Sequence, residues 1–230
     1  MTTLYYSQDA QDRFLNERVF NNYKNGVFVD VGAHDGININ NTYFFEKNLG
    51  WTGVAIEPIK RIYNRLRNNR SCVCINLAVS DVEGEQDFYL NTGYCEMISG
   101  LVQSYDARHK QRLNRESTDF KSETETVKVE VWRLDNILKK CKIDHVHYLS
   151  IDVEGAEFNV IKSIDFDKVF IDVIDFENNY MDTSKGIIEY LKTKGYVLLK
   201  TPNDITGYTD VFMIHTSSEF YVQNVKNLCM

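Results

Sequence analysis

The chain contains no run of about 18 or more apolar residues, so no segment is long enough to span a membrane as a helix. Its first residues, Met-Thr-Thr-Leu-Tyr-Tyr, lack the basic and apolar regions of a secretory signal. Only two prolines occur, and no proline-rich linker or internal repeat divides the chain. These absences predict a cytoplasmic protein with no membrane association, built as a single domain over residues 1–230.

Basic charge is also scarce, because 26 Lys and Arg face 33 Asp and Glu for a net charge of −7. An extended nucleic-acid interface needs a basic face, so this balance disfavours nucleic acid as a partner. The five cysteines show no zinc-ligand spacing. Cys72 and Cys74 alternate with apolar residues, which indicates reduced core thiols rather than a disulfide framework. No pattern indicates an oligomeric state.

Short apolar segments rich in β-branched residues alternate with helical patterns, which indicates an open parallel sheet with helices on both faces. The predicted strands are residues 27–31, 52–56, 72–76, 148–153, 169–176, 196–200 and 211–215. The predicted helices are residues 41–48, 59–69, 134–140, 157–162 and 184–194. The last two strands are joined by a short loop, so we expect an antiparallel hairpin. The fold class is α/β, a Rossmann-like, seven-stranded and mostly parallel sheet.

A long insertion separates the third and fourth strands. It contains predicted strands at residues 85–90 and 127–132, and we expect residues 91–123 between them to be irregular. Long irregular segments in compact domains are usually functional. Residues 91–123 are therefore predicted to cover the acceptor site as a lid, whereas residues 1–25 are predicted to form an N-terminal helical segment.

Polar residues follow the ends of the predicted parallel strands, where doubly wound sheets bind ligands. The first strand leads into Asp-Val-Gly-Ala-His-Asp-Gly at residues 30–36. Buried carboxylates need a partner, so Asp30 is expected to face the cationic side of a ligand. Glu57 ends the second strand and would accept hydrogen bonds from the two hydroxyls of a ribose. Asp81 would accept from an adenine amino group.

Two cofactor classes use this arrangement. A nicotinamide-dependent oxidoreductase would need the pattern Gly-x-Gly-x-x-Gly, but the spacing here is Gly32-x-x-x-Gly36. Ala33 and His34 lie where a diphosphate requires bare backbone. The turn suits a smaller zwitterionic group, such as the amino-acid end of S-adenosylmethionine. An NAD-dependent oxidoreductase remains an alternative at this point.

Several segments resemble the FkbM family of S-adenosylmethionine-dependent methyltransferases. They are residues 30–33 with Gly36, Asn41-Thr42, Glu57-Pro58, Ala-Val-Ser-Asp at residues 78–81, Leu134-Asp135 and Ile-Asp-Val-Glu-Gly-Ala-Glu at residues 151–157. The resemblance implies a class I methyltransferase fold and methyl transfer, usually to a hydroxyl of a sugar or natural product. It implies cofactor contacts at Asp30, Gly32, Ala33, His34, Gly36, Asn41, Thr42, Glu57, Pro58, Ala78, Val79, Asp81 and Asp152. Many members have lysine in place of Ser150, so a catalytically inactive S-adenosylmethionine-binding module is a further alternative.

Candidate catalytic residues lie near the ends of the fourth and fifth strands. An alkyl hydroxyl must lose its proton as it attacks a methyl group. Asp152, Glu154 and Glu177 are acids placed to remove that proton. His109, in the insertion, is a candidate general base near neutral pH. The alternatives are that Asp152 and Glu154 cap the following helix and that His109 is an exposed loop residue.

The same strand ends also suggest a cation site. Carboxylate and amide oxygens are ligands for Mg²⁺, and Asp152, Glu177 and Asn178 resemble in position the metal triad of catechol-type O-methyltransferases. Mg²⁺ or Mn²⁺ there would lower the pKa of an acceptor hydroxyl, whereas the alternative is a set of solvated loop acids. We therefore predict an S-adenosylmethionine-dependent O-methyltransferase acting on a sugar, a glycan or another small-molecule acceptor.

Overall fold

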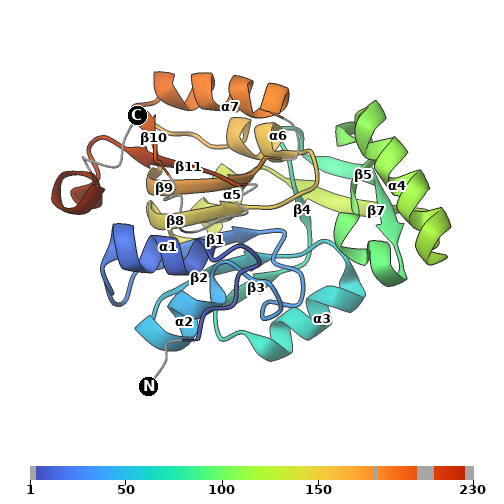
Figure 1. The fold of residues 1–230 in the computed structure, drawn as a ribbon, viewed down its shortest axis with the longest axis horizontal. Coiled ribbons are helices and arrows are strands. Elements are labelled where there is room, and N and C mark those ends of the chain that lie inside the picture. The colour runs from blue at the N-terminus through green and yellow to red at the C-terminus, as the bar shows by residue number, and fades with distance from the viewer. Residues whose placement is uncertain (1–3, 179–180, 201–209, 226–230) are drawn as a thin grey trace.

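The computed structural model describes residues 4–178, 181–200 and 210–225. Its centre is a seven-stranded sheet in the order β10-β11-β9-β8-β1-β2-β3 (Figure 1). Its strands are β1 (Val27–Val31), β2 (Thr52–Ile56), β3 (Val73–Ile75), β8 (His145–Ile151), β9 (Phe170–Glu177), β10 (Tyr196–Leu198) and β11 (Asp210–His215). All pairs from β3 to β9 are parallel, and β11 runs antiparallel to both β9 and β10. The predicted α/β class, sheet and hairpin are confirmed.

Two apolar cores cover the two faces of this sheet, because side chains alternate along each buried strand. Val29 and Val31 of β1 belong to the first core, together with residues of α5 (Leu134–Cys141), α6 (Glu157–Lys162) and α7 (Met181–Thr193). Phe28 belongs to the second core, with residues of α1 (Gln11–Phe14) and α2 (Tyr43–Leu49). α3 (Lys60–Asn69) packs its Leu66 against Ala55 of β2. The helices predicted between strands are thus present, with ends shifted by a few residues.

The N-terminal segment contains one helical stretch, from Gln11 to Phe20. After α1 the chain continues as a π-helix from Leu15 to Phe20. Phe14, Leu15 and Phe20 are fully or almost fully buried in the second core. This segment therefore closes the face of the sheet that carries Phe28.

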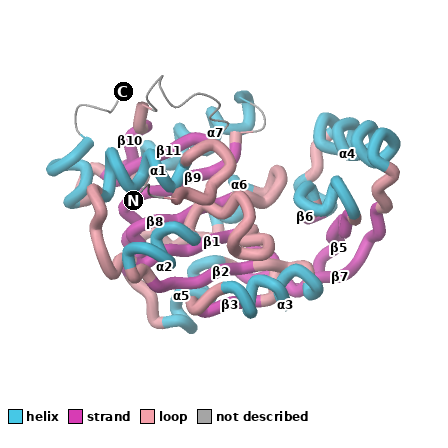
Figure 2. Tube along the Cα trace, turned by 60° about the horizontal axis from the view of Figure 1, so that its bottom comes forward, coloured by secondary structure: helices cyan, strands magenta, loops and turns pink. Residues whose placement is uncertain are grey.

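The insertion forms a second sheet beside the first. Its order is β4-β7-β5-β6, from the strands β4 (Ala78–Val79), β5 (Gly84–Asn91), β6 (Gly100–Leu101) and β7 (Thr124–Trp132). The antiparallel pair β5 and β7 corresponds to the two strands predicted in the insertion. Figure 2 shows this sheet and its helix α4 at one end of the molecule.

Residues 91–123 are not irregular, and that prediction is wrong. They contain α4 (Ala107–Phe120), a helix of 14 residues, and two short helical turns, η2 (Gly93–Ile98) and η3 (Val102–Ser104). α4 buries only His109 and Leu113, so it has no apolar stripe of helical period for a sequence pattern to reveal. Asp106 caps its start by accepting hydrogen bonds from the backbone N–H groups of Arg108 and His109.

Membrane-spanning helices are absent from the described part of the chain, since none of its helices combines the length and the apolar character needed.

Candidate active site

A cavity opens at the carboxyl ends of β1 and β2, the edge of the sheet that the sequence indicated. The space between its walls amounts to about 670 Å³, part of it open to solvent. The strands β1 and β2 and the segments that follow β1, β2 and β8 contribute Val31, Gly32, His34, Ile56, Glu57, Pro58, Ile59, Ile62, Asp152, Val153 and Ala156. The insertion and its flanks contribute Leu77, Ala78, Val79, Phe88, Glu96, Met97, Ser99, Gly100 and Leu101. Residues 91–123 therefore do form part of the wall.

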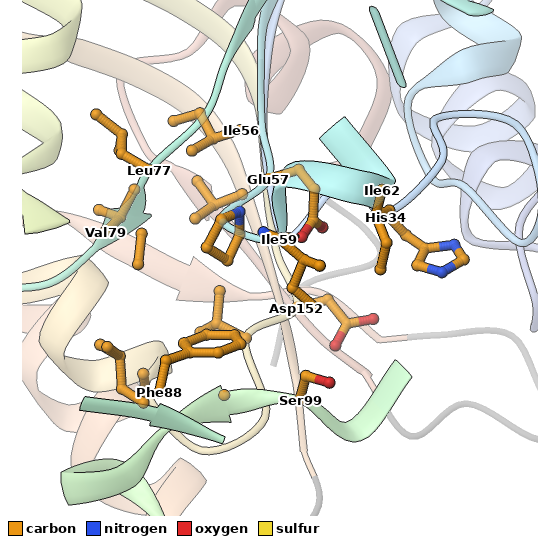
Figure 3. Close-up of a pocket in the computed structure, with 18 of the residues that line it drawn as sticks. His34, Ile56, Glu57, Ile59, Ile62, Leu77, Val79, Phe88, Ser99 and Asp152 are labelled. Carbon is orange, nitrogen blue, oxygen red and sulfur yellow. Dashed lines mark hydrogen bonds between the residues drawn. The ribbon is translucent and has the colours of Figure 1, made fainter. Parts of the chain in front are cut away.

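Glu57 carries the main polar group on the β2 side of the cavity (Figure 3). Its side chain is almost completely buried, and its Oε1 accepts a 2.7 Å hydrogen bond from the N–H of Ile59. Burial raises the pKa of Glu57 to about 7, although hydrogen bonds from the backbone of Ile59 and His34 lower this pKa in part. Near neutral pH this carboxyl can therefore gain or lose its proton when a ligand binds beside it.

The rest of this half of the cavity is apolar. Ile56, Ile59, Leu77, Val79 and Phe88 surround the space next to Glu57 (Figure 3). An apolar slot beside one carboxyl group fits a flat base joined to a sugar, because the base buries its faces while the carboxyl accepts from hydroxyls. The arrangement thus fits an adenosyl group.

Asp30 does not line the cavity, which corrects the expectation that it faces a cationic ligand. Its Oδ2 accepts from Thr42 Oγ1 at 2.7 Å and from Asn40 Nδ2 at 2.9 Å. Arg70 Nη1 lies 3.6 Å from the same oxygen, and this arginine is itself buried and bound to Glu46. Asp30 lies between Val29 and Val31, so it points to the opposite face of the sheet from those two residues. Its partner is therefore Arg70.

Asp81 also lies outside the cavity, which corrects the proposed contact with an adenine amino group. Its Oδ2 accepts a 2.8 Å hydrogen bond from Lys162 Nζ, and this pairing lowers the pKa of Asp81 against the effect of burial. Ala78 and Val79 line the cavity. The N–H of the next residue, Ser80, donates a hydrogen bond to the carbonyl of Trp132, and the chain turns away from the cavity at this point. The Asp81 carboxylate therefore binds Lys162 and does not line the cavity.

Several other residues that carry the resemblance to the FkbM family lie outside the lining of the cavity. Thr42 donates to Asp30, and Asn41 Nδ2 donates to Ser150 Oγ at 3.1 Å. Ala33 is buried against Leu66, and a Cβ on Gly36 would lie 2.5 Å from Leu66. These residues shape the turn after β1 and do not line the cavity. The positions that line it are Gly32, His34, Glu57, Pro58, Ala78, Val79 and Asp152.

Gly32 shows why this turn needs glycine. Its φ is +90°, and a Cβ there would lie 1.8 Å from the carbonyl oxygen of Asp152. The N–H of Asp152 donates to the carbonyl of Val31 at 3.0 Å, so the ends of β1 and β8 are held edge to edge. Asp152 is thereby fixed at the cavity wall.

Three carboxyl groups meet beyond this wall. Asp152, Glu154 and Glu177 each offer an oxygen within 4.8 Å of the others. The Asp152 side chain is exposed to the open cavity, but the protein around it still desolvates its carboxyl and raises the pKa of Asp152, and neighbouring Glu177 adds to that shift. Burial, followed by the neighbouring acids, raises the pKa of Glu154 to about 8 and of Glu177 to about 9. We refer to these three residues as the acid group.

The acid group contains two members of the predicted metal triad. Asp152 and Glu177 do lie together, and Glu154 supplies a further carboxyl oxygen within 4.8 Å of theirs. The side-chain oxygen of Asn178 accepts a hydrogen bond from Ser184 Oγ. Asn178 is thus bonded to a residue of α7.

His109 belongs to helix α4 and is almost completely buried, so the interpretation as an exposed loop residue is wrong. Its Nε2 lies 3.9 Å from Glu154 Oε2. Burial lowers the pKa of His109, which favours a neutral imidazole near pH 7. The helix thus brings a possible proton acceptor next to the acid group.

Sequence reasoning missed two charged residues of this region. Glu96, from η2, lines the cavity and accepts hydrogen bonds from Arg65 at 2.8 Å and from Arg61. His34 Nε2 lies 3.2 Å from the same carboxylate. Arg112, from α4, has its Nη1 3.4 Å from Glu154 Oε2. Neither Glu96 nor Arg112 follows the end of a predicted strand, so no signal in the sequence pointed to either residue.

Comparison with known protein families identifies the class of protein to which this chain belongs. The model of the methyltransferase FkbM domain matches residues 30–198. The chain therefore belongs to the FkbM methyltransferase family. Family membership makes it a methyltransferase and implies S-adenosylmethionine as the methyl donor, which replaces the nicotinamide alternative. No curated protein matches the chain in sequence.

Two solved structures also resemble the chain. One is the precorrin-6y C5,15-methyltransferase from Geobacter metallireducens GS-15, at a TM-score of 0.42 and 12% identity, covering 93% of this chain and 90% of that one. The other is a putative rRNA-methylase from Clostridium thermocellum, at a TM-score of 0.42 and 9% identity, covering 93% of this chain and 97% of that one.

Proposed function

We propose that the protein transfers a methyl group to a hydroxyl oxygen of a sugar, a glycan or another small molecule. The observation that carries this proposal is the position of the acid group. Asp152 lines the cofactor cavity, and its carboxyl oxygen lies within 4.8 Å of oxygens of Glu154 and Glu177. A proton acceptor therefore lies directly beside the space that fits the methyl donor.

The chemistry of hydroxyl methylation needs such an acceptor. S-adenosylmethionine, when bound, supplies a methyl group activated by its sulfonium. An alkyl hydroxyl becomes a good nucleophile only as its proton leaves, and a base works best when its pKa lies near the working pH. The raised pKa of Glu154, about 8, meets that condition. Asp152 would orient the acceptor, and the neutral imidazole of His109 is the alternative base.

We further propose that the acid group holds Mg²⁺ or Mn²⁺ during turnover. Three carboxylate oxygens within 4.8 Å are a donor set that a hard divalent cation accepts. A cation there would also relieve the repulsion between the three acids. Activity is then expected to fall in EDTA and to return with added Mg²⁺ or Mn²⁺. Unchanged turnover in EDTA would remove the metal from this proposal and leave Glu154 or His109 as the base.

The direct test is transfer of labelled methyl from S-adenosylmethionine to a panel of sugars, glycans and other hydroxylated compounds, with matched amines alongside. Wild-type protein is expected to label hydroxyl acceptors. Asp152→Asn should lower the rate at least tenfold, whereas Glu125→Gln, an exposed acid on β7, should not. Labelling of amines alone would contradict the oxygen specificity. Cofactor binding without labelling of any compound would support the inactive binding module.

A further inference from the structure

The short helical turn η2 of the insertion forms one wall of the methyl-donor cavity. Glu96 and Met97 of this turn line the cavity. Cys95 and Ile98 lie three residues apart and share another side of the turn, where they are buried in an apolar cluster with Leu113 of α4. Apolar contacts thus hold η2 to the rest of the insertion, and a different set of contacts must hold it to the main sheet and its helices.

Glu96 makes those contacts across the rim of the cavity. Arg61 and Arg65 lie one turn apart on α3 and donate to different oxygens of the Glu96 carboxylate, Arg65 at 2.8 Å to Oε1. His34, in the turn after β1, places its Nε2 3.2 Å from Oε1. One carboxylate therefore joins η2 to two elements on the opposite side of the cavity mouth.

His34 extends this connection to the carboxyl group that is expected to hold the ribose. Its backbone N–H donates to the Glu57 side chain. Its φ is +49°, a left-handed conformation that is costly for a residue with a side chain and persists only when its surroundings hold it. Glu57 binds the backbone of His34 and Glu96 contacts its ring. Glu96 therefore helps to hold the turn beside Glu57 as well as the wall formed by η2.

The floor of the cavity depends on other contacts. Ile62 of α3 packs with Phe88 and Leu101 of the second sheet in a buried apolar cluster. The side chains of Arg61 and Arg65 are 58% and 44% exposed, by contrast. Exposed ion pairs are weak, each changing an equilibrium constant by about fivefold at most, and salt screens them. The ion pairs at the rim can therefore separate while the floor stays packed.

We propose that Glu96 is a positioning residue that latches η2 over the bound methyl donor, so that the donor leaves the cavity only after this carboxylate separates from Arg61 and Arg65. The insertion then controls how long the cofactor is retained, in addition to forming part of the cavity wall. The latch involves neither the acceptor nor a metal ion, and it requires that the methyl donor occupies this cavity.

Dissociation of tritiated S-adenosylhomocysteine from the full-length protein, chased with excess unlabelled compound, tests the latch. Glu96→Gln is expected to speed dissociation about five- to tenfold, because the neutral amide loses both arginine ion pairs. Raising NaCl from about 0.05 M to about 0.5 M should speed dissociation from the wild type and have little effect on Glu96→Gln. A dissociation rate of Glu96→Gln equal to that of the wild type would overturn the proposal.

The matched control is Asp87→Asn, which removes an exposed ion pair with Lys128 that lies within the second sheet. This variant should release S-adenosylhomocysteine at the wild-type rate. An acceleration equal to that of Glu96→Gln would contradict the latch, and so would absence of S-adenosylhomocysteine binding to the wild type. Methyl transfer to an acceptor plays no part in these measurements, so the latch can hold even where the proposed acceptor class fails.

A double-variant comparison separates a latch from direct contact with the donor. Arg61→Gln combined with Arg65→Gln should release S-adenosylhomocysteine about as fast as Glu96→Gln does. Adding Glu96→Gln to that pair should then change the rate little, because the carboxylate no longer has an arginine partner to lose. A full further acceleration would show that Glu96 binds the donor itself and would overturn its role as a latch.

Discussion

Arg70 is the residue that makes a charged first strand possible. Asp30 is buried in β1, where an isolated carboxylate would be costly. Arg70 lies 3.6 Å from it, donates at 2.6 Å to Glu46 and at 2.9 Å to Thr42 Oγ1. The Arg70 guanidinium therefore links α3 and α2 to the turn after β1. Asp30, which the sequence analysis predicted to face a ligand, is instead part of this structural network.

Replacing Arg70 is expected to destabilise the fold strongly. Arg70→Gln leaves the Asp30 carboxylate buried without its cation, and breaking such a pair from one side costs about 3–5 kcal/mol. Denaturant unfolding should show this loss in the free energy of unfolding. Arg67→Gln, an exposed position on the same helix, should change it by less than about 0.5 kcal/mol. A cost for Arg70→Gln as small as that of Arg67→Gln would contradict the account of Asp30.

The strands of the main sheet can be predicted from the sequence, whereas helix α4 of the insertion cannot. β1, β2 and β8 are almost entirely buried, and the polar residues that follow their ends mark the edge of the sheet where the cavity lies. α4 has charged residues on most of its surface and only two buried residues, so its helical form depends on capping and on contact with Gly155. Its contact with Glu154 joins positions 42 residues apart, which no local pattern encodes.

The cap of α4 is expected to control the order of this element. In Asp106→Ala the N–H groups of Arg108 and His109 lose their acceptor, which costs about 1 kcal/mol. Amide hydrogen exchange in the first turn of α4 should then be about fivefold faster, with β1 and β8 unaffected. Asp119→Ala, at an exposed position near the end of the same helix, is the control and should leave that turn unchanged. Equal exchange in both variants would show that packing on Gly155, not the cap, holds the helix.

The molecule as a whole concentrates carboxyl groups at one edge of its sheet. The strand order places the ends of β1, β8 and β9 side by side, so Asp152 and Glu177 meet although 25 residues separate them. The rule for doubly wound sheets predicted this meeting from sequence. It did not predict the partners of Asp30 and Asp81. These partners, Arg70 and Lys162, lie at the ends of helices, and the direction in which each helix presents its side chains is set by the packing of the whole domain.

This concentration of acids predicts how stability depends on pH. The folded pKa values of Glu57, Glu154 and Glu177 are about 7, 8 and 9, each raised from 4.5. Between pH 4.5 and 9 the folded protein therefore binds more protons than the unfolded chain, so stability falls as pH rises. The melting temperature of the cofactor-free protein should decrease from pH 5 to pH 9. Glu177→Gln should flatten the decrease, and a melting temperature that rises over this range would contradict the raised pKa values.

Calorimetric titration with S-adenosylhomocysteine tests whether the cavity beside Glu57 binds the methyl donor. Wild-type protein should bind one equivalent. Glu57→Gln should weaken binding about tenfold or more, because the neutral amide loses a charge-assisted hydrogen bond to the ribose hydroxyls. Asp81→Asn, at the matched position that the structure places outside the cavity, should bind like wild type. Absence of binding, or an equal loss in both variants, would contradict the account.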